Sequence, residues 1–172
     1  ALKYTRVLKC TWVIHGNHTV KCSFLMYSRN KIELNETQMK TLIDAVSFIL
    51  SFSLKNQHLV IHFIPLKDKK YISKNLSNGN VNSGSSHDNE IYVYRYEECL
   101  KVLFHECIHF LGFSHRSFFS KDLVDYYIDK YHLNVQSIDF NEAYTEIFAR
   151  LFFCYYLSNQ SYPRFLHLLE TE

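Results

Sequence analysis

A helix predicted over residues 96–113 constrains this chain more than any other feature of its sequence. Its apolar residues recur at helical spacing and form a broad stripe. The stripe consists of Leu100, Leu103, Phe104, Cys107, Ile108 and Leu111. The same helix carries two histidines and a glutamate, His105, Glu106 and His109. Such groups are costly to bury beside large apolar side chains unless they bind something, so the pattern indicates a core helix that also holds a ligand.

The spacing of these three residues predicts a zinc site. His105 and His109 lie one helical turn apart on one face, so two imidazole nitrogens can reach a single zinc ion. Glu106 points to the adjacent side, where it can contact a water on the metal without joining the pair as a ligand. Zinc lowers the pKa of that water toward ~7, and the glutamate takes the proton as a carbonyl is attacked. HExxH on a helix therefore predicts one zinc ion and Glu106 as general base, against the alternative of a solvent-facing polar cluster.

One candidate for the third ligand is His115, six residues beyond His109. With Gly112 at a sharp turn, HECIHFLGFSH matches HExxHxxGxxH and resembles the metzincin metalloproteases. That resemblance implies a methionine turn downstream of the helix. The only methionines, Met26 and Met39, precede the helix, so the chain departs from the metzincin pattern.

The other candidate is Glu142, in the stretch DFNEAYTEIFARLFF at 139–153. This stretch resembles the glutamate helix of the gluzincins, the thermolysin-like peptidases, whose pattern is close to NExx[ST][DE]. The resemblance implies that Glu142 is the third zinc ligand. It also implies that Glu146, one turn later, accepts a hydrogen bond from the far nitrogen of a zinc-bound histidine, for which His105 is the candidate. A metal-bound histidine nearly always has such an acceptor, and residues 142 and 146 share one helical face.

We favour Glu142 and keep His115 as the alternative ligand. Gly112 then marks the C-terminus of the zinc helix. Ala143 and Ala149 are expected to let the two helices approach closely. The alternative for the two glutamates is a solvated helix face.

The rest of the chain predicts an α+β fold in a single zincin-like domain, 1–172, because strands come first and helices last. A twisted mixed sheet with a backing helix is expected to precede the zinc helix and the glutamate helix. Predicted strands are a pair within 5–28 about the turn HGNH, then 58–66 and 90–95. Predicted helices are 36–54 with Asn35 as N-cap, 96–113 with Glu97 and Glu98 in its first turn, 118–131 and 139–157. Residues 67–89 are expected to be a polar loop, in which 82–84 could border the cleft.

The resemblance extends to the size of the chain and to one strand. A catalytic domain this small is similar to the one-domain minigluzincins. The gluzincin layout implies that strand 90–95 is an edge strand that binds extended substrate by backbone pairing. The composition, rich in Asn, Lys, Tyr and Phe, and the phrase VNSG…IYVYRYEECLKVLFHECIH resemble HExxH proteins of large DNA viruses.

Composition narrows the partners. A formal charge of +2 without a long basic run does not favour nucleic acid as the main partner. No apolar run is long enough for a membrane span, and the N-terminus does not resemble a signal peptide. Five cysteines without CxxC pairs are expected to be free thiols in a reducing compartment, the cytoplasm or, for a viral protein, the host cytoplasm or virion.

The predicted activity is hydrolysis of peptide or isopeptide bonds in a protein or peptide substrate. The alternatives are a metzincin-like peptidase using His115, a catalytically silent zinc-stabilised module that binds a protein, and a zinc hydrolase with another substrate. The residue that stabilises the oxyanion stays open among Tyr144, Tyr155, Tyr156, His132 and His115.

Overall fold

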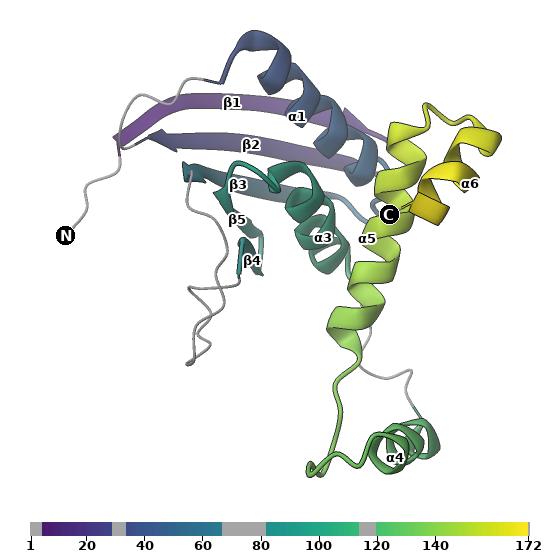
Figure 1. Cartoon of the computed structure of the whole chain (residues 1–172). Helices are drawn as coiled ribbons and strands as arrows, with labels where there is room; N and C mark the ends of the chain where they lie inside the picture. The colour runs from purple at the N-terminus through teal and green to yellow at the C-terminus, as the bar shows by residue number, and fades with distance from the viewer. Residues whose placement is uncertain (1–4, 29–33, 67–81, 114–119, 172) are drawn as a thin grey trace.

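The computed structural model describes residues 5–28, 34–66, 82–113 and 120–171. These residues form an α+β fold with a mixed five-stranded sheet and five helices, which confirms the predicted class (Figure 1). The strands are β1 (Thr5–His15), β2 (Thr19–Ser28), β3 (Gln57–Leu66), β4 (Gly84–His87) and β5 (Glu90–Arg95). The helices are α1 (Glu36–Leu50), α3 (Cys99–Leu111), α4 (Lys121–Lys130), α5 (Asn141–Leu157) and α6 (Tyr162–Thr171).

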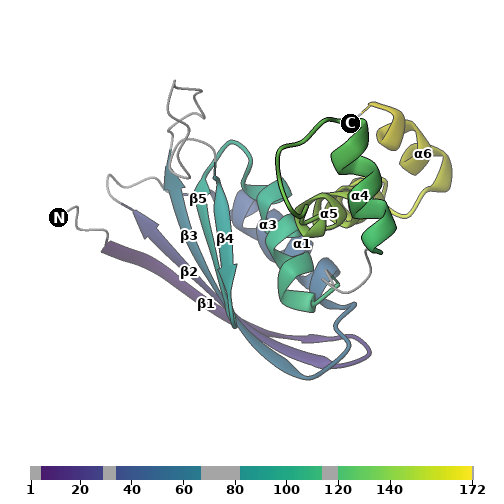
Figure 2. The same ribbon diagram turned by 90° about the horizontal axis from the view of Figure 1, so that it is seen from below.

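The sheet has the strand order β1-β2-β3-β5-β4. The two outer pairs, β1 with β2 and β4 with β5, are antiparallel, and the inner pairs are parallel. All the helices lie on one side of the sheet, with α1 and α3 nearest to it (Figure 2). Helix α3 contacts α1, α5, β4 and β5, so it lies at the junction between the sheet and the outer helices.

Helix α1 begins where the sequence predicts. The Asn35 side chain accepts a hydrogen bond from the Gln38 backbone N–H at 2.8 Å, and Gln38 Oε1 accepts from the Asn35 backbone N–H at 3.0 Å. This capping box satisfies two amides that have no partner within the helix. Asn35 as N-cap is therefore confirmed, while the helix ends at Leu50, earlier than residue 54.

Two rows of apolar side chains cross the sheet beneath the helices. The rows contain Phe24, Ile61 and Ile91, and Met26, Phe63 and Val93. All six side chains are buried, and they form the centre of the core. On β4 the rows end in Ser86, which pairs with Ile91, and Gly84, which pairs with Val93. The core thus changes character at the β4 edge of the sheet.

Strand β4 corrects two expectations. It lies inside the stretch 67–89 that was expected to be a loop, because GSSH contains no apolar residue that could show the alternation of a strand. It also covers β5, so β5 is an inner strand and β4 is the edge strand beside α3. The expectation that 90–95 is the edge strand is therefore wrong, because the neighbouring strand β4 takes that place.

Helix α3 and the C-terminal helix also differ from the sequence prediction. Helix α3 starts at Cys99, so Glu97 and Glu98 precede its first turn, and Glu98 is the N-cap residue. The Glu98 carboxylate accepts a hydrogen bond from Ser83 Oγ at 3.0 Å instead of lying against the helix amides. Helix α6 was not predicted. Its Pro163 stands in the first turn, where the missing amide costs little.

The cysteines are all free, as expected, and three of them are buried. Burial raises the pKa of Cys22 to about 12, so its thiol stays protonated and packs as an apolar group. Within the described ranges, no helix combines the length and hydropathy that crossing a bilayer requires.

The β1–β2 turn packs tightly against the end of α1, and Gly16 makes this contact possible. A Cβ at this position would lie 2.1 Å from the backbone oxygen of Ser51. We expect Gly16→Ala to lower the free energy of unfolding by roughly 1–3 kcal/mol, because backbone must shift to admit the methyl group. Urea denaturation followed by the fluorescence of Trp12 measures this. The exposed neighbour Asn17→Ala is the control, and an equal effect in both variants would contradict the prediction.

Candidate metal centre

Helix α3 presents its two sides to different surroundings. Its buried residues are Leu103, Phe104, Glu106, Cys107, Ile108 and Leu111. His105 and His109 lie at the boundary, with side chains that are 21% and 17% exposed. The helix ends at Gly112, whose φ of 72° is left-handed and whose N–H donates to the backbone oxygens of His109 and Ile108. Gly112 therefore ends the helix, as predicted.

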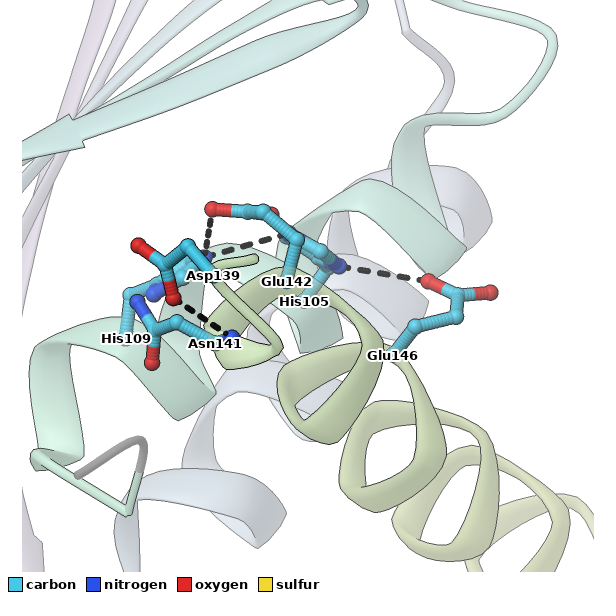
Figure 3. Close-up of polar contacts among 6 residues, drawn as sticks. All are labelled: His105, His109, Asp139, Asn141, Glu142 and Glu146. Carbon is cyan, nitrogen blue, oxygen red and sulfur yellow. Dashed lines mark hydrogen bonds and ion pairs between the residues drawn. The ribbon is translucent and has the colours of Figure 1, made fainter. Parts of the chain in front are cut away.

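Helix α5 crosses α3 and brings two glutamates to the histidines. Asn141 starts this helix, and its N–H donates to Asp139 Oδ1 at 2.9 Å (Figure 3). Thr145 and Ala149 are buried on its inner face. Ala143 is exposed, so the expectation that it mediates the helix contact is wrong. Residue 143 lies about 100° round the helix from residue 142, outside the face that residues 142, 145, 146 and 149 share.

Three side chains converge at the crossing of these helices. His105 Nε2 lies 3.1 Å from Glu142 Oε2, and His109 Nε2 lies 3.3 Å from Glu142 Oε1 (Figure 3). The two Nε2 atoms are 3.2 Å apart. Each residue therefore offers one ligand atom to the same small region. The structure thus brings His105, His109 and Glu142 together, although His105 and Glu142 are 37 residues apart in the chain and meet only where α5 crosses α3.

The three donor groups fit a zinc ion. Zinc takes imidazole nitrogen and carboxylate oxygen at about 2.0–2.1 Å in tetrahedral geometry, which puts neighbouring ligand atoms about 3.3 Å apart. The two imidazole nitrogens are 3.2 Å apart, and each lies 3.1 or 3.3 Å from one of the two Glu142 oxygens, so these distances are close to that edge length. With one ligand atom taken from each residue, all three atoms lie within 4.8 Å of one another. Two imidazoles and one carboxylate also form a donor set that zinc prefers over harder divalent ions. Glu142 is 72% exposed, so the cluster opens to solvent on the side of the carboxylate.

Glu146 contacts the far nitrogen of one histidine. Its Oε2 lies 3.2 Å from His105 Nδ1, while its Oε1 lies 3.4 Å from Lys101 Nζ (Figure 3). A carboxylate in this place accepts the Nδ1–H and leaves Nε2 free of its proton, which is the tautomer that a metal requires. The contact between Glu146 and Nδ1 of His105 is thus of the kind that orients a metal-binding histidine.

Glu106 has a different environment from the other glutamates of the cluster. It is only 6% exposed, and burial is the main cause that raises the pKa of its carboxyl group. The nearby His105 and a hydrogen bond from the Ser86 side chain oppose this rise in pKa, while the charge of Glu142 adds to it. Glu106 is thus a buried carboxyl group held beside the donor cluster and apart from it.

Burial also acts on His109. It lowers the pKa of the imidazole, although Glu142 raises it in part. A lower pKa favours the neutral ring, which is the form that binds metal ions.

A groove of about 770 Å³ contains the whole cluster. Its walls are β4 with the two residues before it, the polar side of α3 and the first turns of α5. The lining residues are Asn82, Ser83, Gly84, Ser85, Ser86, Glu98, Lys101, Val102, His105, Glu106, His109, Asn141, Glu142 and Glu146. The stretch 82–84 borders the groove, as the sequence suggested. Ser85, Ser86, Lys101 and Val102 were missed, and only the helical spacing of 101 and 102 with 105 and 106 could have indicated the last two.

The remaining sequence candidates do not line the groove where the structure describes them. Four of the sequence candidates for stabilising the oxyanion are absent from its walls, namely Tyr144, Tyr155, Tyr156 and His132. His115 lies outside the described residues. The position of Glu142 beside both histidines therefore supports Glu142 as the third ligand.

Comparisons with protein-family models, with curated proteins and with solved structures find no match for this chain.

We expect Glu142→Ala to weaken zinc binding by more than the 10- to 100-fold change that is typical for the loss of an outer partner of a ligand. The reason is that this variant removes one of the three protein donors that the described part of the chain brings to the cluster. Competition with a chromophoric chelator measures the affinity. The exposed Glu97→Ala controls for loss of a negative charge near α3. Retained affinity in Glu142→Ala together with lost affinity in His115→Ala would contradict the assignment.

For Glu146→Ala we expect a smaller loss of zinc affinity, about 10- to 100-fold, because the variant frees His105 without removing a donor. The same chelator competition applies. Ile147→Ala is the control, since this side chain is exposed on the same helix and is not part of the groove. Equal affinities in the two variants would show that Glu146 does not act on His105.

Proposed function

We propose that this chain is a zinc metallopeptidase of gluzincin type. The observation that carries the proposal is the convergence of His105, His109 and Glu142 within hydrogen-bonding distance of one another, beside the buried carboxyl group of Glu106. The order of the elements supports a zincin-like arrangement, in which a mixed sheet is followed by the HExxH helix and then by the glutamate helix.

The residues of the site divide the chemistry between them. A zinc ion held by His105, His109 and Glu142 would supply a Lewis acid that acidifies water and polarises a carbonyl group. Glu106 accepts the proton of the attacking water on its carboxylate and passes it to the leaving amine. Glu146 keeps His105 in its ligating orientation through the contact at Nδ1.

The groove supports a peptide or isopeptide as the substrate. Strand β4 forms one wall, and its outer edge pairs with no other strand among the described residues. An extended chain can add to such an edge through main-chain hydrogen bonds, which read backbone and tolerate many side chains. Most of the residues that line the groove are polar, and Val102 is the one aliphatic side chain among them.

Two other classes of function share this geometry. A silent zinc-stabilised module would bind a protein in the groove without cleaving it, and a zinc hydrolase could act on another carbonyl compound. The buried Glu106 favours an enzyme over a silent module, because burying a carboxyl group costs stability and this one would add nothing to a structural zinc site. The outer edge of β4, which no strand within the described ranges pairs with, favours a peptide over a small molecule.

We expect Glu106→Gln to keep zinc and to lose peptidase activity by about 10²- to 10⁴-fold, the range for removal of a general base. Activity is measured on unfolded casein and on a pool of internally quenched peptides, with zinc content determined in the same samples. Asn17→Ala, in the exposed β1–β2 turn, serves as the control. A zinc-loaded wild type that binds these peptides without cleaving them would instead support the silent module.

A further inference from the structure

The sheet ends in an unusual way beside α3. Each of its two central rows of buried side chains passes through large apolar residues on β2, β3 and β5. At β4 the same rows continue into Ser86 and Gly84. A strand that only closed the core would be expected to place branched apolar residues at these two positions. Two side chains of α3, Val102 and Glu106, lie close over Gly84 instead, and Glu106 is the charged one.

Gly84 provides the room for this carboxyl group. A Cβ on Gly84 would lie 2.9 Å from Glu106 Oε1 and 2.5 Å from Val102 Cγ1. The backbone of Gly84 is not in the left-handed region, so conformational freedom does not explain the glycine. Its role is the close approach of β4 to α3, at the position where α3 carries Glu106.

Ser86 provides a hydrogen bond to the same group. Residues 84 and 86 face the helices, whereas the intervening Ser85 faces the other side, where its Oγ lies 2.9 Å from Tyr94 Oη. The Ser86 hydroxyl donates to the Glu106 carboxylate. Such a bond to a charged acceptor in a buried place is stronger and more directional than one in water.

We propose that Gly84 and Ser86 are positioning residues that place the carboxylate of Glu106 over the metal centre. The proposal rests on the proposed function of Glu106 as general base. Gly84 lets the edge strand come close enough, and Ser86 then fixes the rotation of the carboxylate by donating to one of its oxygens. The other oxygen is left for the water that loses its proton.

In this arrangement, a single strand, β4, contacts both the general base and the substrate. The strand that holds Glu106 through its inward residues is also the strand whose outer edge is open to an extended peptide. A small shift of β4 would therefore move both the scissile bond and the base by similar amounts. Their contact with the same strand therefore keeps the base and the scissile bond at a constant separation. This matters because displacements of about 1 Å can slow catalysis strongly.

The first test separates catalysis from binding. We expect Ser86→Ala to lower kcat on the quenched peptides by about 10- to 100-fold with little change in KM, because the base loses its orientation while the strand edge remains. Ser86→Thr retains the hydroxyl in a β-branched residue suited to a strand, and it should recover most of kcat. Ser23→Ala is the control, since Ser23 is a strand serine whose hydroxyl contacts another hydroxyl, that of Thr11, outside the groove.

Gly84→Ala tests the other half of the proposal. The added methyl group should displace the Glu106 carboxyl group and lower kcat, while zinc content stays at the wild-type level because no ligand moves. Loss of zinc in this variant would show that β4 supports the metal ligands, which would overturn the assigned role of Gly84.

The second test needs no substrate and uses the metal-free protein. Ser86→Ala should lower the midpoint of urea denaturation in the wild-type background, because it leaves the buried Glu106 carboxylate without this donor. In the Glu106→Met background the same substitution should have little effect, since no carboxylate remains to be satisfied. Equal shifts in both backgrounds would show that Ser86 acts on another group.

The two proposals fail in different ways. A zinc-loaded wild type that cleaves none of the peptides overturns the peptidase function, and the catalytic role of Ser86 with it. An active wild type whose kcat is unchanged in Ser86→Ala overturns only the role of Ser86. Both proposals are supported if Ser86→Ala lowers kcat, Ser86→Thr restores it, and the shift of the urea midpoint depends on the presence of Glu106.

Discussion

The burial of one side of α3 is the constraint on which the rest of this structure depends. Leu103, Phe104, Cys107 and Ile108 are buried between the sheet and the other helices, and this fixes the rotation of α3 about its own axis. Once that rotation is fixed, His105 and His109 have to lie at the boundary of the core, one turn apart. The site is therefore a consequence of how the helix packs, and not a separate addition to it.

The glutamates show how environment separates the roles of chemically identical groups. Glu106 is almost completely buried, and the nearby Glu142 is largely exposed. Burial raises the pKa of Glu106, which suits a group that must exchange a proton. The exposed Glu142 places its carboxylate oxygens against both histidines, which suits a metal ligand. The exposure of Glu146 is intermediate between the two. One of its oxygens contacts His105, and the other lies near Lys101.

The edge of the sheet is a second determinant of the site. An unpaired edge is usually protected in a folded protein, because it can pair with other chains. Here the edge strand is short, carries no apolar residue and borders the groove. Its inward positions, Gly84 and Ser86, accommodate a buried carboxyl group, which explains why the pattern of a core-forming strand is missing from its sequence.

The sequence by itself determined the features that depend on helical spacing. It predicted the α+β class, the cap at Asn35, the end of α3 at Gly112 and the common face of His105 and His109, all of which follow from contacts within a few residues. Only the tertiary structure decided that β4 covers β5, that Gly84 and Ser86 face Glu106, and that Thr145 and not Ala143 is buried on α5. These features depend on strand order and on how α5 crosses α3, and such long-range pairings leave no periodic signal in the residues that make them.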